Sequence, residues 1–168
     1  STTIAADGNG DLTVDLGVVP VFALGNQVWV DLNDNGSIDG TEAPVPDGVV
    51  VNLWSSDHTT LVGTTTTAGG FYLFDGLLAG DYVVELDASN FAAGGSLVGY
   101  RSSTPTGADD QVDGDDNGAP VDPAAPYTSG IRTSTITLGG VGAEPMAEDP
   151  TSTTIAADGN GDLTVDLG

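Results

Sequence analysis

Residues 27–48 read QVWVDLNDNGSIDGTEAPVPDG, and the structure expected on each side of the central acidic run decides the fold. Before that run, residues 27–32 alternate between aliphatic and other side chains, which is the periodicity of a strand. After it, Pro44 and Pro46 exclude a helix that begins where the acidic run ends. The acidic run is therefore expected to join two strands.

The acidic run, residues 31–42, matches the calcium-loop pattern D-x-[DN]-x-[DN]-G-x5-E at every constrained position. Calcium takes about six to eight hard oxygen ligands, and this spacing wraps them around one point, with Gly36 at the sharp turn. A solvated acidic turn is the alternative. The strands expected on both sides distinguish the loop from an EF-hand and from a dockerin, since both need a helix after the loop. The predicted ligands are Asp31, Asn33, Asn35, Ser37, Asp39 and Glu42.

The chain has 168 residues and a net charge of −23, with 25 acidic residues, two arginines, no lysine and no cysteine. It lacks the basic surface that a nucleic-acid partner requires, and an anionic membrane surface would repel it. No apolar run is long enough to span a bilayer. Repulsion among so many carboxylates favours bound divalent cations, and adaptation to high salt is a compatible explanation.

Residues 1–17, STTIAADGNGDLTVDLG, recur letter for letter as residues 152–168. This repeat predicts a tandem array in which residues 18–168 form one unit and residues 1–17 are the terminal strand segment of the preceding repeat. A duplicated strand is the alternative. Adjacent identical repeats are then the expected partners. Residues 1–17 are expected to be disordered or irregular, with displacement of 152–168 or head-to-tail pairing with a neighbour as alternatives.

Short stretches of alternating or β-branched residues, separated by Gly- and Asp-rich turn signals, predict an all-β antiparallel sandwich. Six aromatic residues are expected in its core and on its sheet faces: Trp29, Trp54, Phe71, Tyr72, Phe74 and Tyr82. An exposed Trp29 that stacks on a ligand is the alternative. The expected strands lie near 26–32, 49–54, 60–66, 71–75, 81–87, 97–102, 133–138 and 162–167.

Residues 103–130 have a different composition, rich in Asp, Gly and Pro and without periodicity. A long loop of this kind inside a compact domain usually has a function. Calcium would neutralise and fold its carboxylates, with a solvated loop as the alternative, so more than one calcium ion is expected. The predicted ligands are Asp109, Asp110, Asp113, Asp115 and Asp116. A third candidate site comprises Asp158, Asn160 and Asp162, for which a polar turn before the last strand is the alternative.

Four segments, LGNQVWVDLNDNGSIDGTE, VPDGVVVNLW, GTTTTAGGFYLFDGLLAGDYVVELD and DLTVDLG, follow one another in this order, with the acidic loop before the last. Together they resemble an SdrD B-like domain, which is related to the Cna B-type modules of bacterial surface adhesins. The resemblance implies a Greek-key β-sandwich, Ig-like or prealbumin-like, with long calcium-binding loops. It implies tandem repetition between a ligand-binding head and the cell envelope. Many Cna B-type modules carry a lysine isopeptide bond, which cannot form here.

The expected function is a calcium-stabilised stalk or spacer of a large extracellular bacterial surface adhesin or filament. The alternative is an adhesive module that itself binds a host protein, a glycan or a surface. No enzyme is expected. The single histidine, His58, lies in Ser55-Ser56-Asp57-His58, and neighbours this close rarely align as a catalytic triad, so a polar hairpin turn is predicted there.

Overall fold

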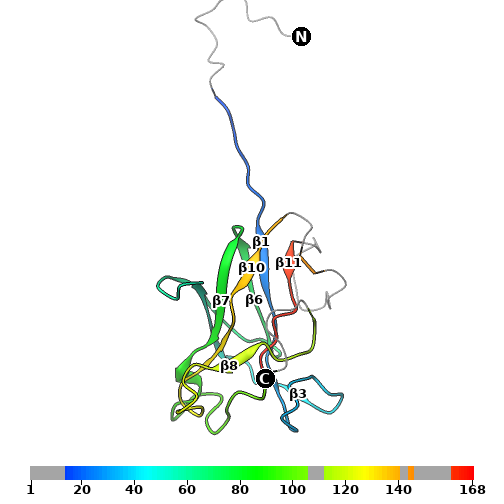
Figure 1. Ribbon diagram of the computed structural model, residues 1–168, viewed down its shortest axis with the longest axis vertical. Coiled ribbons are helices and arrows are strands. Elements are labelled where there is room, and N and C mark those ends of the chain that lie inside the picture. The colour runs from blue at the N-terminus through cyan, green and yellow to red at the C-terminus, as the bar shows by residue number, and fades with distance from the viewer. Residues whose placement is uncertain (1–13, 106–111, 141–143, 146–159) are drawn as a thin grey trace, which may run out of the picture.

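The computed structural model describes residues 14–105, 112–140, 144–145 and 160–168 (Figure 1). Over these ranges the regular structure consists of strands and one short 3₁₀ helix, η1 (Ala88–Asn90). The all-β fold class is therefore confirmed. No helix within these ranges has the length and apolar character needed to cross a membrane.

The first sheet has three strands, with β1 (Phe22–Gln27) between β6 (Phe71–Leu77) and β11 (Gly161–Asp162). β1 pairs with β6 in the antiparallel sense and with β11 in the parallel sense. The parallel pairing departs from a purely antiparallel sandwich, because the final segment of the chain runs beside β1 in the same direction (Figure 1).

The second sheet contains the remaining long strands, and the chain leaves it at β6 and returns to it at β7. β6 therefore lies in a different sheet from β5 and β7, its neighbours in sequence, as in a Greek key. Its order is β5 (Leu61–Thr66), β4 (Val50–Ser55), β7 (Gly80–Leu86), β9 (Ile131–Thr133) and β8 (Gly118–Pro120), with β10 (Ile136–Leu138) also paired to β7.

A two-stranded antiparallel pair, β2 (Trp29–Val30) and β3 (Ala43–Pro44), holds the ends of the first acidic loop. Trp29 pairs with Pro44, and the Trp29 side chain is 2% exposed. The expectation that the loop joins two extended segments is confirmed. Trp29 is a core residue, as predicted.

The hydrophobic core lies between the two sheets. Leu24 of β1 and Phe74 of β6 belong to the same buried cluster as Leu53 of β4 and Val84 of β7. Alternation places these residues on the inner faces of their strands, where burial of apolar surface stabilises the sandwich.

The strand expected at 97–102 is wrong. Residues 97–99 form turns. The chain folds back there, because the backbone N–H of Leu97 donates to the carbonyl of Asn90 at 2.8 Å, and this buries Leu97. The strand expected from residue 26 begins four residues earlier, at Phe22. The strand expected over 162–167 has only two residues in β11, although residues 161–167 are all buried.

Candidate metal centre

The first acidic loop closes around the carboxylate of Asp31. Asp31 accepts hydrogen bonds from the backbone N–H groups of Asn33 at 3.1 Å, Asp34 at 2.6 Å and Gly36 at 2.8 Å. Asp34 and Gly36 have positive φ angles of 60° and 72°, so the backbone curls around this carboxylate. Partial burial raises the pKa of Asp31, but the backbone donors outweigh it and hold the pKa below its usual range.

The other side-chain oxygens of the loop belong to the same hydrogen-bonded network. The side-chain amides of Asn33 and Asn35 donate to the Asp39 carboxylate at 2.7 and 3.1 Å. Glu42 accepts from the Asp39 backbone N–H at 3.0 Å, and Asn35 accepts from the Ser37 backbone N–H at 2.9 Å. The structure therefore brings all six predicted residues into one compact loop.

The second acidic segment packs against the first through the backbone. Ile38 N–H donates to the carbonyl of Gly114 at 2.8 Å, and Asp116 N–H donates to the carbonyl of Gly36 at 2.8 Å. Two segments about 80 residues apart, which the sequence presents as separate candidate sites, thus form one structural unit.

Asp116 is one of the predicted ligands of the second segment and is fully buried. Its carboxylate accepts from Ser103 Oγ at 2.7 Å and from the backbone N–H groups of Gly118 at 2.8 Å and Gly168 at 3.1 Å. Burial raises its pKa to about 6; the hydrogen bonds oppose that shift, and the nearby charge of Asp31 adds to it.

Asp166 is a further buried carboxylate in this region, and the sequence did not point to it. Its oxygens accept from the backbone N–H groups of Gln27 at 3.0 Å and Gly114 at 2.7 Å. Burial raises its pKa to about 8, and Asp113 contributes to that rise. Asp113 in turn accepts from the Asn26 side-chain amide at 2.7 Å. Asp166 therefore links β1, the second acidic segment and the end of the chain.

The remaining predicted ligand of the second segment within the described ranges is Asp115. It pairs with Ser37 of the first loop in an isolated antiparallel bridge. Asp109, Asp110 and Asp158 lie outside the residues that the structure describes.

Asn160 and Asp162, the described residues of the third candidate site, each contact a different part of the chain. The backbone carbonyl of Asn160 accepts from Ala23 N–H at 3.0 Å, which extends the pairing with β1. The Asp162 carboxylate accepts from the backbone and the hydroxyl of Thr164 at 3.2 and 2.7 Å. Burial raises the pKa of Asp162.

Within the described ranges, no group of three or more Asp, Glu, His or Cys side chains is gathered in a way that could hold a metal ion. The first loop nevertheless supplies a set of hard oxygens, which suits calcium. A calcium ion there would use the amide oxygens of Asn33 and Asn35 and the carbonyl of Ser37 in addition to the three carboxylates. Calcium binding by these residues stays a prediction.

Asp34, inside the first loop, connects the loop to Arg101 and Thr104. Its carboxylate lies 2.8 Å from Arg101 Nη2 and accepts from Thr104 N–H at 2.9 Å. The bond to Arg101 holds the pKa of Asp34 below its usual range. The loop pattern treats this position as unconstrained, so the sequence contained no signal for the contact.

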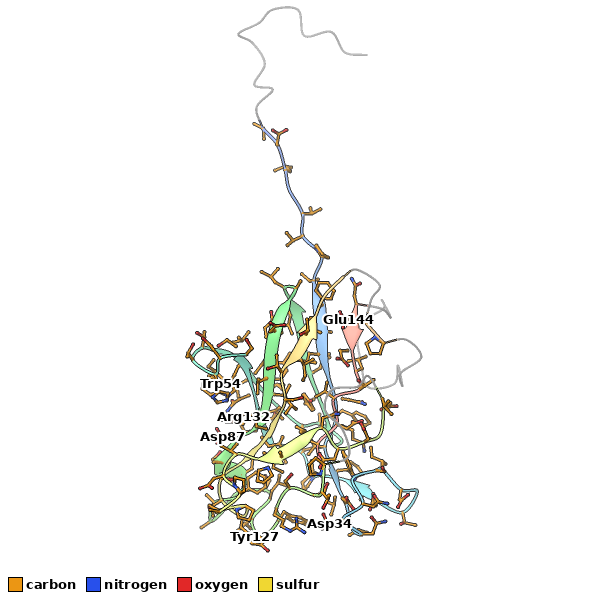
Figure 2. The ribbon with its side chains drawn as sticks, viewed as in Figure 1. Asp34, Trp54, Asp87, Tyr127, Arg132 and Glu144 are labelled. Atoms are coloured by element: carbon orange, nitrogen blue, oxygen red, sulfur yellow. The ribbon has the colours of Figure 1, made fainter. Side chains whose placement is uncertain are left out.

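His58 lies in the turn between β4 and β5, as predicted. Its ring stacks on Trp54, with ring centroids 4.4 Å apart, and its Nε2 lies 3.0 Å from Glu85 Oε2 (Figure 2 labels Trp54). Ser55 Oγ donates to Asp57 at 2.6 Å. These contacts do not form the serine–histidine relay of a hydrolase.

Comparison with known proteins identifies a matching family and staphylococcal relatives. Residues 22–139 match the SdrD B-like domain family. The chain is 35% identical over 119 residues to serine-aspartate repeat-containing protein D of Staphylococcus aureus strain Newman. This match covers 70% of this chain and 8% of that protein. It is 33% identical over 117 residues to a fibrinogen-binding protein of Staphylococcus epidermidis, which covers 68% of this chain and 10% of that protein.

Among solved structures, the chain is similar to a minor pilin of Streptococcus agalactiae. The sequence identity is 20%, the TM-score is 0.29, and the match covers 40% of this chain and 32% of the pilin. The chain spans about a tenth or less of the two curated relatives named above.

Proposed function

The chain belongs to the SdrD B-like domain family, and on that premise we propose that it is a calcium-stabilised spacer repeat of a large extracellular bacterial surface adhesin. The matched relatives are many times longer than this chain, and one is named as a fibrinogen-binding protein. A domain that makes up so small a share of such proteins is well suited to a repeated structural role.

The observation that carries the proposal is the union of the two acidic segments. Backbone hydrogen bonds join the two segments. The buried carboxylates of Asp116 and Asp166 lie where these segments meet the end of the chain. Cations that neutralise this region would favour the folded state. The chain has neither the lysine of an isopeptide bond nor a cysteine, so calcium is the proposed substitute for a covalent lock.

The placement of the chain ends supports the role of a spacer. The N-terminal arm leaves the sandwich at one end, at the start of β1, while Gly168 lies toward the other end, near β3 (Figure 1). Units joined in tandem would then extend in one direction and add length. The proposed location is the bacterial cell surface, and the proposed partners are adjacent copies of the same repeat.

Calorimetric titration of the 168-residue chain with calcium tests the proposal. The unaltered chain should bind calcium, and calcium at a hundredfold excess over Kd should raise the free energy of unfolding by about 2.7 kcal/mol per site. Asp31→Ala should remove binding at the first loop, and Asp113→Ala should remove any binding that depends on the second segment. Asp15→Ala, in the exposed arm, is the matched control and should leave the titration unchanged.

The proposal fails if chelation of calcium leaves both the unfolding temperature and protease resistance of the chain unchanged. The alternative function, direct adhesion, predicts saturable binding of the single chain to a host protein or glycan. That alternative stays a prediction.

A further inference from the structure

A cavity of about 240 Å³ lies beside β2 and the final residue of the chain. Apolar and aromatic side chains contribute much of its lining, among them Val28, Trp29, Leu97, Tyr100 and Tyr127. Asp34 and Tyr127, which both line it, lie at the end of the molecule opposite the N-terminal arm (Figure 2). Tyr100 and Tyr127 are 48% and 55% exposed, so the cavity has an open aromatic rim.

Hydrogen bonds of Gly168 hold this end of the chain in place at the cavity. Gly168 lines it, donates its N–H to Asp116 at 3.1 Å and accepts at its carbonyl from Ser103 N–H at 3.1 Å. A Cβ atom at this position would lie 2.9 Å from the Trp29 ring, so the backbone rests directly on the indole. A residue that followed Gly168 would therefore start at the cavity.

The internal repeat identifies that residue. Because 152–168 repeats 1–17, the position after Gly168 in a tandem array corresponds to Val18, and the next three correspond to Val19, Pro20 and Val21. In the described arm, Val18 is 96%, Val19 68% and Val21 52% exposed, so these valines have little packing within their own unit.

We propose that the cavity is the docking site for the linker Val18–Val21 of the following copy. This inference rests on the tandem arrangement of the proposed function and adds a defined contact between units. Four extended residues span about 13 Å, which is enough to cross a cavity of this size. Pro20 restricts its own backbone and favours an extended Val19, so the segment loses little freedom on docking.

The chemistry of the linker and that of the cavity agree. A chain with a net charge of −23 repels its own copies through most of its surface, whereas the linker carries no charge and the cavity offers Trp29, Leu97 and the tyrosine rim. Burial of the valines would remove exposed apolar surface from both partners at once. The docked linker would hold adjacent units in one orientation.

The test extends the full 168-residue chain at its C-terminus. One form carries Val-Val-Pro-Val and the matched control carries Ser-Ser-Pro-Ser. The apolar extension should raise the unfolding temperature by about 2–4 °C above the control, a shift typical of a small stabilising contact in a chain of this length. It should also change the Trp29 fluorescence, measured in a Trp54→Phe background.

Variants of the rim locate the effect. Tyr100→Ser and Tyr127→Ser replace exposed side chains and should abolish the difference between the two extensions. Val62→Ser replaces a side chain of similar exposure on β5 and should preserve it. Equal unfolding temperatures and equal Trp29 emission for the two extensions would overturn the inference. So would concentration-dependent association that persists in Val18→Ser and Val19→Ser, because it would assign the cavity to another surface.

The experiment separates the two proposals. If the extensions behave alike while calcium still stabilises the unextended chain, the docking inference fails and the spacer function stands. If the apolar extension docks but calcium has no effect on stability, the contact between units stands and the calcium-dependent part of the proposed function fails.

Discussion

Residues 14–17 and 165–168 have the same sequence, Val-Asp-Leu-Gly, and opposite environments. In the first copy Val14 and Leu16 are 69% and 92% exposed, whereas in the second Val165 and Leu167 are fully buried. The second copy lies beside β1, where Leu167 N–H donates to the carbonyl of Gln27 at 3.0 Å. Burial of this segment is therefore a property of the neighbouring strand and not of the four residues.

The difference extends to the polar member of the segment. Asp166 is buried between β1 and the second acidic segment, while its counterpart Asp15 is exposed. One sequence thus provides an exposed arm at one end of the unit and a closing segment at the other. Paired substitutions at equivalent positions can measure how much of the stability comes from the environment.

The largest difference is expected at the leucines. Leu167→Ala leaves a cavity in the core and should lower the free energy of unfolding by about 2–5 kcal/mol. Leu16→Ala should change it by less than about 0.5 kcal/mol, because this side chain is exposed. Denaturant unfolding of the two variants measures both values. Equal losses would show that the first copy also packs in the core.

A second difference, smaller per pH unit, is expected at the aspartates, in the dependence of stability on pH. Burial raises the pKa of Asp166 from 3.8 to about 8, so the folded state binds a proton that the unfolded state releases. With a chelator present, this contribution to stability is complete below about pH 4 and is lost as the pH rises toward 8, by at most about 1.4 kcal/mol per pH unit.

Asp166→Asn should flatten this decline between pH 5 and 8, and Asp15→Asn should leave it unchanged. The side-chain amide introduced by Asp166→Asn has one oxygen, so the backbone N–H of either Gln27 or Gly114 loses its present acceptor. The slope of stability against pH is therefore the informative quantity, and not the stability at one pH. Unfolding curves collected across this range give the slope. An unchanged slope in Asp166→Asn would contradict the assignment to this carboxyl group.

The smallest difference is expected at the glycines. A Cβ at residue 168 would meet Ser103 Oγ at 2.7 Å and the Trp29 ring, whereas nothing lies within 4 Å of one at residue 17. Gly168→Ala should therefore cost about 1 kcal/mol, since the end of the chain can shift, and Gly17→Ala should cost almost nothing. Thermal unfolding measured side by side would detect the difference. A neutral Gly168→Ala would mean that the backbone does not rest on Trp29.

Local patterns predicted much of the fold. The strands near 49–54, 60–66, 71–75 and 81–87 are present because alternation and turn residues act over a few positions. The strand expected at 97–102 failed because Leu97 and Val98 carry a strand-like pattern within a series of turns. The beginning of β1 was missed because an apolar run before a glycine can be either a linker or a buried strand.

The candidate site likewise has one part that local sequence predicts and one part that it does not. The first loop is local in sequence, so its six oxygen-bearing residues could be named in advance, and the structure places them in one loop. Asp166 could not be named, because between Val165 and Leu167 it is expected to face solvent on an alternating strand. The second acidic segment covers it instead, and Gly114 N–H donates to its carboxylate at 2.7 Å.

The sequence by itself determined the all-β class and the strand-flanked acidic loop, because both depend on residues that are neighbours along the chain. It also determined the internal repeat, because identical letters are recognised at any separation. The tertiary structure alone decided that the two acidic segments join and that Asp116 and Asp166 are buried. It also decided that residues 165–167 are buried while residues 14–16, with the same sequence, are exposed. Two identical segments cannot differ through their own propensities. They differ because residues 165–168, unlike residues 14–17, lie where β1 offers free backbone groups and an apolar surface to cover.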